Sequence, residues 1–80
     1  MIKVYVLGTA VPGKTKEVYA ALRYVPKVKR YYQVMGPYDI VVEIEVEELA
    51  QVPPLLSDYI RTIPGIDSTT SLVTFPEGTN

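Results

Sequence analysis

Apolar residues fill both alternating sets of positions in residues 2–8, the segment that opens the chain. This pattern is typical of a central strand whose two faces are both covered. From Gly13 onward the apolar positions change to a spacing of three and four residues, which predicts a helix that ends at Pro26. The buried stripe expected for this helix is Val18, Ala21, Leu22 and Val25.

Two further strands are predicted at residues 28–35 and 40–47, where apolar and charged residues alternate in the second. The residues between them, Gly36 to Asp39, have the composition of a tight turn, so the two strands should form an antiparallel hairpin. Opposite charges then face each other across the hairpin. The expected pairs join Lys29 and Arg30 to Glu45 and Glu47.

Pro53 and Pro54 cannot lie inside a helix but suit its first turn, which predicts a second helix from about residue 53 to residue 63. A Pro-Gly pair ends this helix, and residues 66–75, rich in Thr, Ser and Val, are typical of an exposed or edge strand. The buried stripe expected for the second helix is Leu56, Tyr59, Ile60 and Ile63.

The order strand-helix-strand-strand-helix-strand predicts the ferredoxin-like α+β fold. In this αβ-sandwich, one four-stranded antiparallel sheet carries both helices on one face. We expect a single domain at residues 1–76 and a flexible tail at 77–80. Because the first strand and the hairpin are apolar or aromatic on both faces, a second subunit should cover the face that the helices leave bare.

The composition lacks the residues on which most enzyme chemistry depends. The 80 residues include no cysteine and no histidine, which excludes disulfides, thiolate and imidazole metal sites, and catalysis by either residue. We therefore expect no enzyme, no cofactor and no metal. No stretch is long and apolar enough for a membrane span, and the N-terminus lacks the features of a signal peptide, so the sequence predicts a cytoplasmic protein.

Charge is distributed unevenly, because residues 1–38 carry a net charge of +6 and residues 39–80 a net charge of −7. The basic residues lack the density of a nucleic-acid-binding surface, so we expect no direct DNA binding. The asymmetry instead indicates basic and acidic elements that lie side by side in the sheet or meet across a subunit contact.

The segment GTAVPGKT, residues 8–15, matches the phosphate-loop pattern G-x-x-x-x-G-K-[ST] between a predicted strand and a predicted helix. A phosphate-loop enzyme needs a parallel sheet and more than about a hundred residues, and Pro12 removes one N–H donor from the loop. We therefore interpret Pro12 and Gly13 as a turn, with Lys14 and Thr15 solvated in the first helical turn. An anion at this helix N-terminus stays open.

The segment VMGPYDIVV, residues 34–42, offers the groups that a small ligand would use. Gly36 permits a tight turn, Tyr38 offers a ring and a hydroxyl, and Asp39 offers a carboxylate that could pair with a cationic amine. From the spacing alone, an ordinary hairpin turn stays open as the alternative, with Asp39 hydrogen-bonded to its own backbone.

Four segments carry a resemblance to a known family. They are VPKV at 25–28, VMGPYDIVVEIEV at 34–46, LLSDYIRTIPGI at 55–66 and STTSLV at 68–73. Together they resemble the C-terminal effector domain of the leucine-responsive regulator/asparagine regulator (Lrp/AsnC) family, the domain for regulation of amino-acid metabolism (RAM). VPG at 11–13 is also similar to the family's first loop, which gives the phosphate-loop match an ordinary origin.

The resemblance implies a domain that dimerises through its sheets and assembles into tetramers, octamers or rings, with a free amino acid bound between dimers. By the same resemblance, the loop containing Met35, Gly36, Tyr38 and Asp39 holds the carboxylate and amine of the amino acid, and Thr69 and Thr70 of a neighbouring copy complete the pocket.

Full-length members of the family carry a helix-turn-helix domain, whereas this chain begins at the first strand of the effector domain. We therefore expect a stand-alone amino-acid sensor, or a partner of full-length regulators, that does not itself bind DNA or a membrane. Two other classes stay open: an oligomeric adaptor that binds no ligand, and a small dimeric enzyme that uses Tyr and Asp or Glu side chains.

Overall fold

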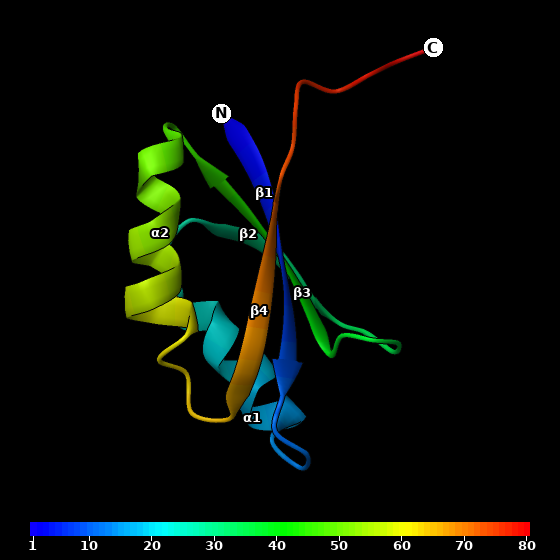
Figure 1. Cartoon of the computed structure of the whole chain (residues 1–80), viewed down its shortest axis with the longest axis vertical. Helices are drawn as coiled ribbons and strands as arrows, with labels where there is room; N and C mark the ends of the chain where they lie inside the picture. Colours follow the sequence, from blue (N-terminus) through cyan, green and yellow to red (C-terminus); the bar gives the residue numbers. More distant parts are fainter.

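The computed structural model describes Met1 to Asn80 and contains one four-stranded sheet with its helical segments on one side (Figure 1). This arrangement confirms the predicted ferredoxin-like α+β fold. The elements are β1 (Ile2–Ala10), α1 (Thr15–Ala21), β2 (Val28–Gln33), β3 (Ile40–Val46), α2 (Val52–Leu55) and β4 (Ile66–Val73). Three short helical segments accompany them: the 3-10 segments η1 (Leu22–Tyr24) and η2 (Leu49–Gln51), and a π-helical turn, η3 (Leu56–Ile60).

The sheet has the strand order β2-β3-β1-β4, and all neighbouring strands are antiparallel. β1 is therefore a central strand and β4 an edge strand, as the sequence predicts. In the register, Gly8 of β1 lies between Ile40 of β3 and Thr69 of β4. This row links the hairpin of β2 and β3 to the last strand.

The core lies between the sheet and the helices. Val4 and Val6 of β1 are fully buried, as are Val18 and Leu22 from the first helical segment. Each such side chain contributes about 1.5–3 kcal/mol when it leaves water. The predicted stripe of the first helix is confirmed, because Val25 is also buried and Ala21 packs against the same cluster.

The second helical segment differs from its prediction. It begins at Leu49, before the two prolines, because the Gln51 side-chain oxygen accepts hydrogen bonds from the backbone N–H groups of Glu47 and Glu48 at 2.8 and 3.1 Å. The buried stripe includes Leu56, Ile60 and Ile63 as expected, but Tyr59 is 48% exposed, so its assignment to the core was wrong.

A widened turn explains the position of Tyr59. The Arg61 N–H donates to the Leu56 carbonyl at 2.8 Å, which is the five-residue spacing of a π turn. In a wider turn, a residue and the one four positions after it point to the same side of the helix. The residue three positions after it points to a different side. Leu56 and Ile60 therefore share the core side, and Tyr59 faces solvent.

The ion pair of the hairpin is also shifted from its prediction. Arg30 lies opposite Glu43, and its Nη1 atom is 2.9 Å from Glu43 Oε2. The register shifts between Val28 and Arg30, because Lys29 is an extra residue in β2 without a partner in β3. The predicted pairing of Lys29 and Arg30 with Glu45 and Glu47 was therefore wrong. Glu45 lies instead opposite Lys3 of β1.

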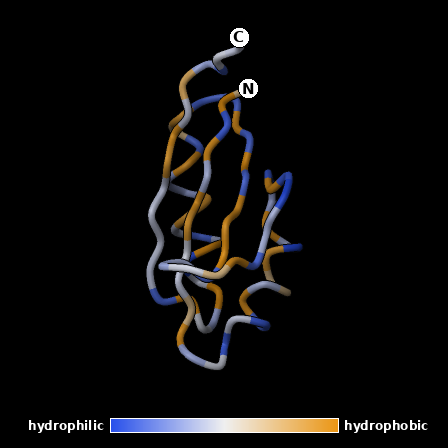
Figure 2. Tube along the Cα trace, turned by 90° about the vertical axis from the view of Figure 1, so that its right-hand side faces the viewer, coloured by the Kyte–Doolittle hydropathy of each residue, from blue (hydrophilic) through white to orange (hydrophobic).

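The sheet face away from the helices, called the open face below, carries a mixture of aromatic, aliphatic and charged side chains. Hydrophobic positions recur along the trace of the central strands in Figure 2, and alternate ones point away from the helices. Glu43 is buried on this face while its partner Arg30 is exposed. The face consists of Lys3, Tyr5, Leu7 and Thr9 of β1, Arg30 and Tyr32 of β2, Val41, Glu43 and Glu45 of β3, and Ser68, Thr70 and Leu72 of β4.

Candidate functional site

The loop between β2 and β3 projects from the sheet. Its first two predicted site residues, Met35 and Gly36, are not covered by the rest of the chain. The Val34 N–H donates to the Asp39 carbonyl at 2.8 Å, which closes the base of the loop. Met35, the next residue, is 100% exposed. Gly36 has a φ of +142°, a conformation that side chains rarely adopt, and nothing lies within 4 Å of the position a Cβ would take. Any ligand held by Met35 and Gly36 must therefore be covered by another molecule.

Asp39 joins this loop to the central strand. One carboxylate oxygen, Oδ2, accepts a hydrogen bond of 2.7 Å from the Ala10 backbone N–H, and the Asp39 N–H donates to the Gly8 carbonyl at 2.9 Å. The other oxygen, Oδ1, has no hydrogen-bond partner in the chain. The carboxylate is thus oriented by β1 rather than by its own turn, and it retains one oxygen for an external donor.

Thr69 and Thr70 lie on opposite faces of β4. Thr69 belongs to the helix side, where its Oγ1 accepts a hydrogen bond of 3.3 Å from Arg61 Nε. Thr70 lies on the open face opposite Leu7. β1 separates both from the hairpin, so they stand about 10 Å, two strand spacings, from the row of Asp39 and Ile40. The six predicted site residues therefore form two groups that do not meet within one chain.

Two groups of β1 near these residues, the Thr9 hydroxyl and the Ala10 N–H, had no signal in the sequence. Thr9 Oγ1 lies 2.7 Å from Ser68 Oγ and accepts a hydrogen bond of 3.1 Å from the Ser68 N–H. The Thr9 hydroxyl also donates a longer hydrogen bond, 3.5 Å, to Asp67 Oδ2. Ala10, whose N–H binds the Asp39 carboxylate, is the next residue after Thr9. The pairing of β1 with β4 shifts its register between these two residues. Their partners belong to other segments of the chain, so only the pairing of the sheet brings them together.

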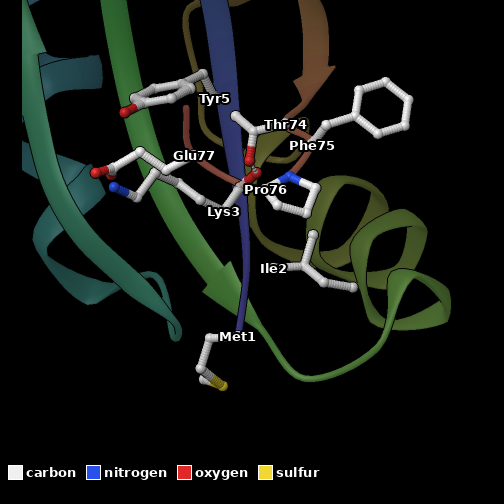
Figure 3. Close-up of a pocket in the computed structure, with 8 residues that line it drawn as sticks. All are labelled: Met1, Ile2, Lys3, Tyr5, Thr74, Phe75, Pro76 and Glu77. Atoms are coloured by element: carbon white, nitrogen blue, oxygen red, sulfur yellow. Dashed lines mark hydrogen bonds between the residues drawn. The ribbon is translucent and has the colours of Figure 1, made fainter. Parts of the chain in front are cut away.

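The cavity of the structure lies at the other end of β1, as Figure 3 shows. Its volume is about 490 Å³, and it opens beside the first strand residues and the segment that follows β4. β1 runs from this cavity to Gly8, so the predicted site residues of the loop between β2 and β3 lie about 10–20 Å from the cavity's lining residues along the strand. The cavity therefore contains none of them; its lining residues are Met1, Ile2, Lys3, Tyr5, Thr74, Phe75, Pro76 and Glu77.

The phosphate-loop match has a different geometry from a nucleotide site. Gly8 lies within β1, paired on both sides, rather than in a loop. The turn before the helix closes where the Lys14 N–H donates to the Val11 carbonyl at 2.9 Å, and α1 has only seven residues. Lys14 is exposed and lies 3.7 Å from Glu17, as expected for a solvated first turn.

No three His, Cys, Asp or Glu side chains gather closely enough to hold a metal ion. No helix has the length and apolar character needed to cross a membrane.

Comparison with known proteins adds an independent line of evidence. Residues 3–77 match the family model of the Lrp/AsnC ligand binding domain. The chain is 30% identical over 69 residues to the HTH-type transcriptional regulator FL11 of Pyrococcus horikoshii. The aligned region covers 86% of this chain and 45% of that protein. It thus spans less than half the length of this curated relative.

Two solved structures extend the comparison. The crystal structure of FFRP-DM1 is 31% identical, covers 94% of this chain and all of its own, and gives a TM-score of 0.85. The feast or famine regulatory protein of M. tuberculosis, solved in complex with L-methionine, shares the fold with 22% identity and a TM-score of 0.83. That match covers 100% of this chain and 54% of the other. With the family model matching nearly the whole sequence, the chain belongs to the Lrp/AsnC family as its ligand-binding domain.

Proposed function

We propose that this domain binds a free L-amino acid between copies of itself and thereby regulates an assembly of Lrp/AsnC-type proteins. The observation that carries the proposal is the carboxylate of Asp39, held by the Ala10 N–H at one oxygen and open at the other. An ammonium group fits this oxygen, because a carboxylate binds a cation more strongly than a neutral donor. A relative of the same fold is solved with L-methionine, which supports the ligand class.

The arrangement of the site residues supports binding between copies. The loop of Met35 and Gly36 is uncovered, and Thr69 and Thr70 lie across β1 from it. A neighbouring copy that places its β4 against this loop would enclose the ligand with both groups. We propose a homo-oligomer as the assembly. The domain would also join mixed assemblies with related regulators, and both would form in the cytoplasm.

The family context argues against catalysis. The matched domain is a ligand-binding domain, and the curated relative is a transcriptional regulator. We accordingly propose that the domain regulates by binding, without turnover and without direct contact to DNA.

A second candidate function is that of an oligomeric adaptor without a ligand. It is favoured by one observation: no cavity exists around the six predicted residues within one chain, and the cavity that does exist lies elsewhere. The two candidates differ in whether any amino acid changes the stability of the protein.

The deciding experiment is a thermal melt of the purified protein with each of the twenty amino acids at millimolar concentration. A ligand present at about 100 times its dissociation constant stabilises the native state by roughly 2.7 kcal/mol. For a domain of this size the melting temperature should rise on the order of ten degrees. The absence of any shift, with assembly intact, would favour the adaptor.

Asp39→Asn is the sharpest variant for this experiment. The amide retains an oxygen that can accept the Ala10 N–H, so the unliganded protein should melt within a few degrees of the original. It removes the negative charge, so the shift with the amino acid should disappear. Asp58→Asn, an exposed carboxylate in η3, is the matched control and should keep the full shift.

A further inference from the structure

The cavity at the end of β1 has no part in the proposed amino-acid site, and hydrogen bonds hold its wall in place. The Thr74 hydroxyl and the Thr74 N–H both donate to the Lys3 carbonyl, at 2.8 and 3.1 Å, where the chain leaves β4. The next residues, from Phe75 to Glu77, line the cavity together with the first residues of β1 (Figure 3). A single chain therefore forms this cavity.

Two opposite charges line the cavity without pairing. Lys3 and Glu77 are both lining residues, and neither belongs to the two ion pairs of the chain, so their charged atoms lie more than 4.0 Å apart. Glu45, which lies opposite Lys3 in the sheet, forms no ion pair with it either. Both charges are thus available to a molecule in the cavity.

The lining side chains divide into a polar and an apolar group. In Figure 3 the charged ends of Lys3 and Glu77 and the Tyr5 hydroxyl lie on one side, whereas Ile2 and Phe75 lie on the other. The Tyr5 hydroxyl takes part in none of the side-chain hydrogen bonds of the chain. Phe75 is 90% exposed, so its ring has apolar surface for a ligand to cover.

The size of the cavity indicates what could fill it. Its volume of about 490 Å³ lies in the range of pockets for drug-sized molecules, so a single amino acid would fill only part of it. A dipeptide with apolar side chains carries an ammonium, a carboxylate, a carbonyl between them and two apolar groups. From the match between these groups and the lining residues, we propose that the cavity binds such a dipeptide.

The two free charges orient the dipeptide. Its carboxylate binds the Lys3 ammonium and its own ammonium binds the Glu77 carboxylate, both as charged hydrogen bonds. The Tyr5 hydroxyl donates to the carbonyl of the peptide bond, and the apolar side chains pack against Ile2 and Phe75. This site goes beyond the proposed function, because it requires neither Asp39 nor a second copy.

Isothermal titration of the protein with L-leucyl-L-leucine tests the site, with one dipeptide per chain expected. Lys3→Gln should weaken the dipeptide about 10- to 100-fold, the loss expected for a charged hydrogen bond. It should leave the C-terminal amide of the dipeptide unchanged, because the amide has no carboxylate. Glu77→Gln should weaken the dipeptide and its amide alike but leave N-acetyl-L-leucyl-L-leucine unchanged, because the acetylated compound has no ammonium.

Three control variants keep the cavity intact. Lys29→Gln and Glu47→Gln remove the same charges from exposed side chains that do not line the cavity, and both should bind all three compounds like the original protein. Asp39→Asn should also bind the dipeptide like the original protein, since Asp39 belongs to the other site.

The outcomes distinguish this site from the proposed function. A protein that does not bind the dipeptide, an equal loss for all three compounds in Lys3→Gln and Glu77→Gln, or a loss in Asp39→Asn would overturn the cavity site. L-leucine bound by Asp39→Asn chains as tightly as the dipeptide would overturn the dipeptide as its occupant. If no amino acid raises the melting temperature while the dipeptide binds with the expected selectivity, the proposed function fails and the cavity site stands.

Discussion

At the scale of single residues, Lys27 has a backbone conformation that its side chain disfavours. Its φ is +71°, the only positive value outside glycine, and its carbonyl accepts a hydrogen bond of 3.1 Å from the Glu45 N–H. The left-handed region costs a residue other than glycine about 1–2 kcal/mol. The pairing of the turn with β3 therefore holds Lys27 in a strained conformation.

Lys27→Gly should stabilise the domain. Glycine avoids the cost of the left-handed conformation. This gain in free energy exceeds the entropic cost of glycine, which loses more chain entropy on folding, about 0.5–1 kcal/mol. The net gain should approach 1 kcal/mol, or about 4–8 °C in melting temperature for a domain of this size. Lys27→Ala removes the side chain without relieving the backbone and should leave the melting temperature unchanged; an equal rise in both variants would attribute the gain to lost charge.

At the scale of elements, the segment from η2 to η3 shows how local hydrogen bonds redirect a helix. The Ser57 hydroxyl donates to the Pro53 carbonyl and the Thr62 hydroxyl to the Asp58 carbonyl, both at 3.0 Å. Such side-chain bonds compete with the regular helical ladder. Together with the π turn they determine which residues face the core, and the Arg61 side chain at the end of the segment reaches Thr69 of β4.

Substitutions at neighbouring positions should reveal the π turn in solution. Ile60→Ala, at a fully buried side chain, should lower the free energy of unfolding by about 2–5 kcal/mol. Tyr59→Ala should cost less than about 1 kcal/mol, because half of its side chain is exposed, whereas a core tyrosine would cost far more. Urea unfolding of both variants measures this order, and a larger loss at Tyr59 would indicate a regular α-helix in its place.

At the scale of the whole molecule, the open face remains uncovered. Tyr32 and Leu72 on this face are 51% and 50% exposed, and Tyr5, Leu7 and Val41 lie between them. A second copy packed sheet to sheet would bury these side chains. It would also enclose the Arg30–Glu43 pair, which already satisfies the buried carboxylate.

Leu7→Asp should convert the protein into a smaller species. Leu7 lies at the centre of the open face, where an unpaired carboxylate would be buried on association. Light scattering coupled to size-exclusion chromatography should report a dimer or larger assembly for the original protein and a monomer for the variant. Val11→Asp changes an exposed apolar residue outside the sheet face and should keep the original mass; loss of assembly in both would show a different interface.

The sequence by itself determined the order of elements, the ferredoxin-like sheet, the stripe of the first helix and the central position of β1. These follow from the periodicity of apolar residues, which reports the burial of each segment locally. The resemblance of VMGPYDIVV and the neighbouring segments also identified the family that the comparisons show.

Only the tertiary structure decided which residues meet across segments. The register shift at Lys29 placed Arg30 opposite Glu43, the π turn exposed Tyr59, and the pairing of β1 with β3 joined Asp39 to Ala10. A bulge depends on how two distant strands pair, and a widened turn depends on a single hydrogen bond within the helix; the spacing of apolar residues reports neither. Periodicity therefore predicts which face of an element is buried, whereas the partners of each side chain emerge only when the strands pair.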